Sequence, residues 1–196
     1  IGGYAFYCCY NLTSVTIPTT LSEVGNWAFD CNSLADIHIS DLSAWCRISF
    51  TNDSTTNPLY RGENLYLNGE LVTDLIIPEG VTSIGNYAFI DCNSLTSVTI
   101  PSSVTAIGKE AFRDCRLERL TLDCNIPNGM NQQSYFHEAL NKAYFDTLVI
   151  GDSVTTIGDW AFSGFNRYWG DDSHLKTIYI GKSVERIGEG AFNECT

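Results

Sequence analysis

Short runs in which apolar and polar residues alternate recur along the chain, at intervals of 22 or 23 residues where the period is uninterrupted. In residues 95–100, for example, Val98 and Ile100 alternate with serine and threonine. Alternation with a period of two is typical of a strand with one buried face. Strands this far apart cannot pair as hairpins, so we expect them to pair in parallel. The runs are residues 12–17, 34–39, 75–77, 95–100, 117–122, 148–150 and 175–180.

A second pattern, Ile/Val-Gly-x-x-Ala-Phe, lies between the runs and occurs six times, beginning at Ile1, Val24, Ile84, Ile107, Ile157 and Ile187. Its glycine permits neighbouring backbones to approach closely, and its alanine and phenylalanine are candidate core residues. The pattern is too short for a stable helix and predicts one helical or 3-10 turn. Self-similarity at this period indicates stacked coils that each contact only their neighbours. We therefore predict one solenoid domain over residues 1–196.

Three segments interrupt the period, namely residues 40–70, 123–144 and 163–174. The first contains Asn68-Gly69 between two apolar runs, which predicts a β-hairpin. In the second, the apolar spacing of residues 134–143 predicts a short amphipathic helix. The third is an aromatic and acidic loop that contains Tyr168 and Trp169. None of the three has the composition of a linker between domains.

The charge balance argues against several classes of partner. The chain has 11 lysine and arginine residues against 23 aspartate and glutamate residues, and its net charge is −12. Nucleic-acid binding needs a basic footprint, and an anionic membrane would also repel this surface. No apolar run is long enough to span a bilayer, so we expect no membrane insertion. Because the sequence starts and stops inside repeats, we interpret it as a piece of a longer protein.

Five of the eight cysteines recur at one place in the repeat, two or three residues after its phenylalanine. We predict that these side chains stack inside the core as free thiols, because free cysteine behaves as a small hydrophobe. Equivalent Cα atoms of adjacent coils lie about 4.8 Å apart, which a disulfide also tolerates. A disulfide between cysteines of adjacent coils therefore remains the alternative to free thiols. The recurring cysteines are Cys9, Cys31, Cys92, Cys115 and Cys195.

Catalytic and metal-binding patterns are missing from the sequence. No Cys-x-x-Cys pair suits zinc, and Asp171, Asp172 and His174 fit a solvated turn better than a cation site. The three histidines lie in different coils, and no Gly-x-Ser-x-Gly or phosphate-binding loop is present. We expect a protein that is not an enzyme and needs no cofactor and no metal.

The full repeat, Leu-x-x-Val-x-Ile-Pro-x-Ser-Val-Thr-x-Ile-Gly-x-x-Ala-Phe-x-x-Cys, resembles the BspA-like leucine-rich repeat. Residues 42–71 also look like a variant coil of that family, whereas the asparagine ladder of other leucine-rich repeats is replaced by serine or cysteine. The resemblance implies an α/β solenoid: a right-handed superhelix of about seven coils, with a concave parallel sheet and short helical turns opposite. It also implies a bacterial, secreted or cell-surface protein that acts in adhesion and protein–protein contact.

Binding is then the remaining function, and the outward strand positions are its first candidate site. They form two columns across the predicted sheet in which most members are serine or threonine, residues that also simply favour strands. Six members differ from that background and are our candidates for contact with a protein partner of the host or bacterial surface. They are Asp36, His38, Asp74, Ile76, Arg119 and Tyr179. The alternative is glycan binding through Tyr168 and Trp169.

Overall fold

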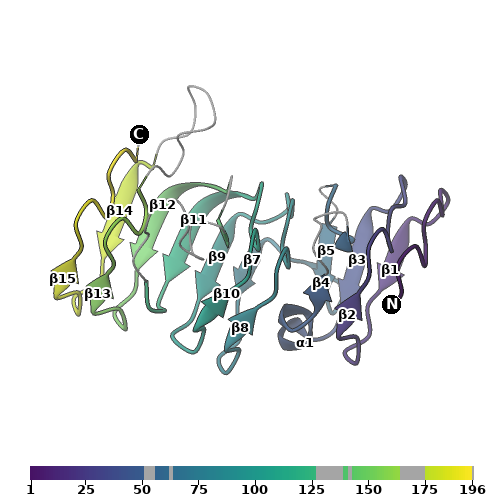
Figure 1. Ribbon diagram of the computed structural model, residues 1–196, viewed down its shortest axis with the longest axis horizontal. Helices are drawn as coiled ribbons and strands as arrows, with labels where there is room; N and C mark the ends of the chain where they lie inside the picture. The colour runs from purple at the N-terminus through teal and green to yellow at the C-terminus, as the bar shows by residue number, and fades with distance from the viewer. Residues whose placement is uncertain (51–55, 62–63, 127–138, 141–142, 164–174, 196) are drawn as a thin grey trace.

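The computed structural model describes residues 1–50, 56–61, 64–126, 139–140, 143–163 and 175–195. Its longer strands follow one another like rungs along the long axis of the molecule, and the two chain ends lie at opposite ends of this array (Figure 1). The chain therefore forms an extended stack in which each coil packs on the coils before and after it.

Two sheets contain the longer strands. The first sheet has the order β1-β3-β5-β6, and the second has the order β14-β12-β11-β9-β7. All pairs are parallel except β5 with β6, so the parallel pairing predicted from the sequence is confirmed. The strands are β1 (Ser14–Thr16), β3 (Asp36–Ile39), β5 (Asn64–Leu67), β6 (Glu70–Leu71), β7 (Asp74–Ile76), β9 (Ser97–Ile100), β11 (Arg116–Leu122), β12 (Tyr144–Ile150) and β14 (Thr177–Ile180).

Shorter parallel pairs form a second row of strands beneath the two sheets in Figure 1. Each short strand coincides with the segment before a repeat glycine, where the sequence predicts only a turn; β4, in the irregular coil, is the exception. The pairs are β2 (Glu23–Val24) with β4 (Ser49–Phe50), β8 (Ser83–Ile84) with β10 (Ala106–Ile107), and β13 (Thr156–Ile157) with β15 (Arg186–Ile187). The helix α1 (Leu42–Cys46) lies beside β4.

One continuous apolar core lies between these layers and runs from the first coils to the last. The repeat phenylalanines stack in pairs across adjacent coils, with ring centroids 5.3 Å apart for Phe89 and Phe112 and 5.2 Å apart for Phe162 and Phe192. Full burial of a phenylalanine contributes about 1.5–3 kcal/mol. A single coil cannot bury such a ring, and stacking the coils supplies the missing contacts.

The segment Gly-x-x-Ala-Phe differs from its prediction. The structure forms hydrogen-bonded turns here, not a helical or 3-10 turn. The second residue after the glycine has a left-handed backbone, with φ of 58° at Tyr87, 52° at Glu110 and 57° at Trp160 and Gly190. A positive φ cannot continue a right-handed helix. Only Gly190 has the residue type that normally adopts this conformation.

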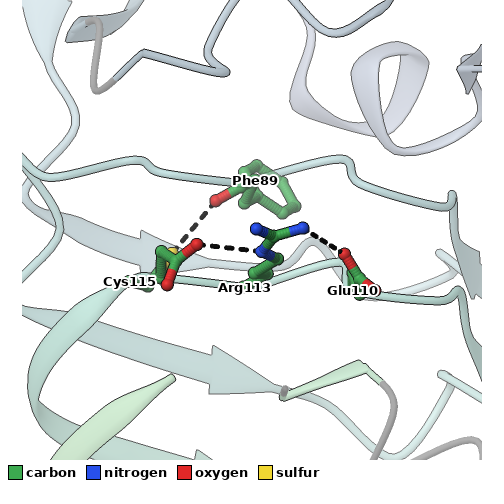
Figure 2. A network of polar contacts seen from close by, with 5 residues as sticks. Phe89, Glu110, Arg113 and Cys115 are labelled. Atoms are coloured by element: carbon green, nitrogen blue, oxygen red, sulfur yellow. Dashed lines mark hydrogen bonds and ion pairs between the residues drawn. The ribbon is translucent and has the colours of Figure 1, made fainter. Parts of the chain in front are cut away.

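Thiols join consecutive coils. The Sγ atom of Cys115 donates a hydrogen bond to the carbonyl oxygen of Phe89 in the preceding coil, at 3.0 Å (Figure 2). Cys31 makes the same bond to Phe6 at 2.9 Å, and Cys195 makes it to Phe162 at 3.0 Å. The recurring cysteine thus occupies a ladder position, where its weak S–H donor meets a backbone acceptor of the neighbouring coil.

The irregular coil is held by buried polar side chains. Asn57 is buried, and its Nδ2 atom donates to the carbonyl oxygens of Tyr87 at 2.7 Å and Ala88 at 3.1 Å. Its Oδ1 atom accepts from the backbone N–H of Leu59 at 2.8 Å. The indole N–H of Trp45 donates to the Ala88 carbonyl oxygen as well, at 2.9 Å. These bonds tie the irregular coil to the turn at residues 87 and 88 of the next coil.

The other predicted interruptions have separate outcomes. The Asn-Gly hairpin is confirmed, because β5 and β6 are antiparallel and the turn has φ of 53° at Asn68 and 88° at Gly69. The amphipathic helix predicted over residues 134–143 lies mostly outside the described residues. Three of its apolar positions that are described, Ala139, Leu140 and Ala143, are buried.

Candidate functional site

The side chains of the two sheets that point away from the core define a surface that we call the open face. Along each strand, buried positions alternate with positions that are partly or fully exposed, as in β3 and β9. Strand register brings the exposed positions of adjacent strands together in rows. The open face therefore consists of two rows on each sheet.

The first sheet carries a compact polar and aromatic group. Asp36 is the register partner of Asn64, and the Asn64 Nδ2 atom donates to the Asp36 carboxylate at 3.2 Å. In the second row, His38 pairs with Tyr66, and their rings stack with centroids 4.8 Å apart at 21°. All four side chains are half-buried, so the group is pre-organised by its own contacts.

The second sheet is wider and more exposed. One row runs Asp74, Ser97, Arg119, Thr147, Thr177, and the other runs Ile76, Thr99, Thr121, Val149, Tyr179. Asp74 accepts a hydrogen bond from the Ser97 hydroxyl at 2.5 Å. Ile76 is 66% exposed at one edge of the sheet, and Tyr179 is 57% exposed at the other. Four strand spacings separate these two side chains, or about 19 Å.

An ion pair lies at the beginning of the last two strands of this sheet. The Lys176 Nζ atom lies 2.8 Å from the Asp146 carboxylate, which also accepts from the Tyr144 hydroxyl. The hydrogen bond from Lys176, followed by that from Tyr144, lowers the pKa of Asp146, and the same contact raises the pKa of Lys176. Both groups are therefore charged at neutral pH.

Within each sheet, the predicted columns give the correct neighbours for each outward residue. Between the two sheets, the predicted neighbours are wrong. The sequence places Asp74 and Ile76 next to Asp36 and His38, whereas β5 and the hairpin strand β6 lie between them. Sequence reasoning thus missed Asn64 and Tyr66. The signal that could have found them is the Leu65-Tyr66-Leu67 alternation before the Asn-Gly turn.

The six candidate residues are therefore divided between the two sheets. Asp36 and His38 lie on the first sheet; Asp74, Ile76, Arg119 and Tyr179 lie on the second. The alternative site, Tyr168 and Trp169, lies outside the described residues.

The described residues contain no group of three or more histidine, cysteine, aspartate or glutamate side chains that could hold a metal ion. All eight cysteines are free thiols, and five of them are buried. Burial raises the pKa of Cys46 and Cys92 to about 12 and that of Cys124 to about 11, and it raises the pKa of Cys115 well above its ordinary value. Thiols in this condition are poor nucleophiles.

Burial predicts which thiols react. A chromogenic disulfide reagent added to the native protein should modify the exposed Cys9 quickly, and Cys46, Cys92 and Cys115 only as the protein unfolds. Raising the pH from about 7 to about 9 should leave the labelling rates of Cys46, Cys92 and Cys115 unchanged, because burial holds the pKa values of these thiols above that window. Peptide mapping of the modified protein measures this, and fast labelling of Cys92 or Cys115 would contradict the stacked-thiol interpretation.

The repeat geometry agrees with a comparison against protein families. The model of the BspA type leucine rich repeat region matches residues 1–58 and 60–196, in six copies. The chain belongs to the BspA-type leucine-rich repeat family. The resemblance inferred from the repeat pattern is confirmed, and so is a solenoid-like repeat fold of mostly parallel strands.

Three solved structures are similar to this BspA-type chain. A leucine-rich repeat protein from Bacteroides ovatus is 19% identical, with a TM-score of 0.47 over 100% of this chain and 56% of the other. A leucine rich cell surface protein from Faecalibacterium prausnitzii is 21% identical, with a TM-score of 0.40 over 100% of this chain and 68% of the other. A leucine-rich repeat protein from Eubacterium ventriosum is 25% identical, with a TM-score of 0.36 over 98% of this chain and 48% of the other.

This BspA-type chain thus spans 56% of the first of these structures. No curated protein matches it. Within the part of the chain that the structure describes, no helix is long and apolar enough to cross a membrane.

Proposed function

We propose that this chain is a non-catalytic binding module that holds a protein partner on its open face. The observation that carries the proposal is the five-stranded second sheet, whose register aligns exposed Ile76 and Tyr179 in one row beside Asp74 and Arg119 in the other. Apolar and aromatic anchors flanked by polar groups are typical of protein interfaces. The row of Ile76 to Tyr179 spans about 19 Å, which suits a protein surface better than a small molecule.

The first sheet supplies a second contact area. The Tyr66 ring is supported by His38, and the Asp36 carboxylate is oriented by Asn64, so neither side chain has to be ordered on binding. Pre-organised side chains reduce the entropic cost of association. A partner that reaches across both sheets would contact this group and the Asp74 and Ile76 edge together. We infer that the partner presents a basic surface to the acidic chain.

We also infer the wider setting from the family. The chain is one right-handed solenoid domain with a concave open face, and it acts in adhesion as part of a secreted or cell-surface bacterial protein. The parallel register supports the handedness, because crossovers between parallel strands are right-handed in nearly all proteins. The family match supports the setting.

A paired screen tests the function. The purified chain is applied to an array of bacterial and host surface proteins and to a glycan array. The variants Tyr179→Ala and Ile76→Ser are then applied to the same two arrays. We expect protein hits that lose about 30-fold or more in affinity in either variant, since truncating an interface anchor costs about 2 kcal/mol.

Glu185→Ala, which changes an exposed residue outside the two sheets, is the control and should leave the protein hits unchanged. Hits on glycans alone would replace the proposal with carbohydrate binding. Protein hits that ignore both open-face variants would show that the binding surface lies elsewhere.

A further inference from the structure

The edge of β7 that faces away from β9 has no strand partner among the described residues. The first sheet ends at β6 and the second begins at β7, so the open face is interrupted between the β5–β6 hairpin and β7 (Figure 1). This edge lies in the interior of the stack, with β1 and β3 beyond the hairpin on one side and β9 to β14 on the other. The interruption is therefore a feature of the fold and does not depend on either end of the chain.

The backbone groups of Asp74 and Ile76 form this edge, which we call the free edge of β7. The N–H of Ile77 points towards β9, because it donates to the Thr99 carbonyl oxygen at 3.0 Å. Successive residues of a strand direct their backbone groups to alternate edges, so those of Asp74 and Ile76 point away from β9. Within the part of the chain that the structure describes, these groups have no backbone partner. An unpaired row of N–H and C=O groups is a template for a further strand.

Exposed apolar side chains lie on both sides of the interruption. Ile76 is 66% exposed on β7, and Leu71 is 42% exposed on β6. Leu71 is the register partner of Tyr66, whose ring stacks on His38 at the open face. Residues paired across antiparallel strands share a face, so Leu71 belongs to the open face as well. Because both side chains remain exposed, neither closes the interruption.

We propose that an extended segment of the protein partner pairs with the free edge of β7 and becomes a further strand of the second sheet. This inference rests on the proposed function and names the part of the partner that is recognised. Hydrogen bonds to the backbone of Asp74 and Ile76 supply affinity, and the side chains of the added strand supply specificity. The outward residues of that strand continue the two rows of the open face, with an apolar residue beside Ile76 and a basic residue beside Asp74.

Charge favours a basic segment over a second copy of this chain as the occupant. The Asp74 carboxylate accepts a hydrogen bond from the Ser97 hydroxyl on β7's paired side, and Glu70 is exposed on β6. The whole chain has a net charge of −12. Two copies joined at this edge would bring like charges together, whereas opposite charges on neighbouring strands are stabilising. The segment that fits therefore carries lysine or arginine among its outward side chains.

The test adds a synthetic heptapeptide of alternating lysine and valine, with both ends blocked, to the intact chain. Hydrogen exchange is followed by NMR at single amides. In the free chain, the Asp74 and Ile76 amides should exchange quickly and the Ile77 amide slowly. With the peptide at about ten times its Kd, exchange at Asp74 and Ile76 should slow by about tenfold, since only the free fraction exchanges. The same peptide with N-methyl groups on its central residues keeps its charge and side chains, and should leave both amides fast.

Two variants at one position separate strand pairing from side-chain contact. Ile76→Ser removes the apolar side chain and keeps the N–H, whereas Ile76→Pro removes both. Proline is compatible with this position because the N–H faces away from β9. We expect Ile76→Pro to bind the peptide about tenfold more weakly than Ile76→Ser does. Circular dichroism checks that both variants fold, and the exchange measurement on the unaltered chain is independent of them.

Several results would overturn the proposal. They are failure of the peptide to bind, binding that leaves the Asp74 and Ile76 amides fast, and equal binding of the N-methylated peptide, which would indicate charge attraction alone. A dimer of this chain that is lost in Ile76→Pro would make a second copy the occupant. A partner from the array that is lost with Tyr179→Ala, and that binds Ile76→Ser and Ile76→Pro equally, would leave binding at the open face intact and overturn only the strand pairing.

Discussion

The substitution Gly108→Ala is expected to unfold the middle of the molecule. A Cβ atom at this position would lie 2.4 Å from the backbone nitrogen of Asn86 and 2.6 Å from the carbonyl carbon of Gly85. Both atoms belong to the backbone of the preceding coil, so the contact cannot be relieved by turning a side chain. Overpacking in a dense interior costs about 1–3 kcal/mol and sometimes more, and a clash with rigid backbone belongs at the upper end.

Gly2→Ala is the matched control, because Gly2 occupies the same repeat position and its added Cβ would meet no atom within 4 Å. Urea denaturation followed by circular dichroism measures both variants. We expect Gly108→Ala to lose at least about 3 kcal/mol or to fail to fold, and Gly2→Ala to stay within about 0.5 kcal/mol. Equal stability of the two variants would mean that the coils are not in backbone contact at the repeat glycine.

The substitution Asn57→Asp is expected to have a similarly large effect, and one that depends on pH. The new carboxylate would lie against the carbonyl oxygens of Tyr87 and Ala88, where the Asn57 amide now donates two hydrogen bonds. An uncompensated buried charge costs about 3–5 kcal/mol. These acceptors would raise the pKa of the introduced carboxyl in the folded state above its unfolded value of about 3.9.

The direction of the pH dependence follows from that raised pKa. At neutral pH the unfolded carboxyl is ionised at no cost, so the variant is destabilised. As the pH falls towards about 4, protonation removes the part of the penalty that is due to the charge, and the one O–H of the neutral carboxyl can donate to one of the two carbonyl oxygens. The stability difference from the wild type should therefore shrink on acidification. Denaturation curves at several pH values measure it, and a penalty independent of pH would contradict the charge argument.

The control for this variant is Asn86→Asp, which makes the same chemical change where the side chain accepts a hydrogen bond from the neighbouring coil. The Asn86 Oδ1 atom accepts from the backbone N–H of Lys109 at 2.9 Å. Asp159, at the same repeat position, accepts from the N–H of Glu189 at 3.0 Å. The chain already uses a carboxylate in this role, so we expect a change within about 0.5 kcal/mol.

The repeat architecture could be predicted because each coil restates the same apolar positions. Strands such as β9, which contains both Val98 and Ile100, alternate clearly between buried and exposed positions, and the parallel pairing of the strands follows from their separation along the chain. The left-handed residues of the Gly-x-x-Ala-Phe turns could not be predicted. Tyr87, Glu110 and Trp160 are residue types that disfavour a positive φ, and the packing of adjacent coils overrides that local preference.

The candidate site was predictable in part, for a related reason. Period-based alignment placed Asp74 and Ile76 correctly relative to Arg119, because β7, β9 and β11 keep the regular register. The strand β5 lies in the irregular coil, so counting by repeats omitted Tyr66 and with it the ring that stacks on His38. An insertion that forms a paired strand leaves the later strands in their predicted register with one another and separates only the two strands that flank it.

The most direct measurement of the proposed function is a hydrogen-exchange footprint of the chain with a protein partner from the array screen. The account predicts slower exchange in the presence of the partner in β7, β9, β11, β12 and β14, with the largest change at the edges that carry Ile76 and Tyr179. Protection confined to the Gly-x-x-Ala-Phe turns or to the residues between 163 and 175 would contradict binding through the open face.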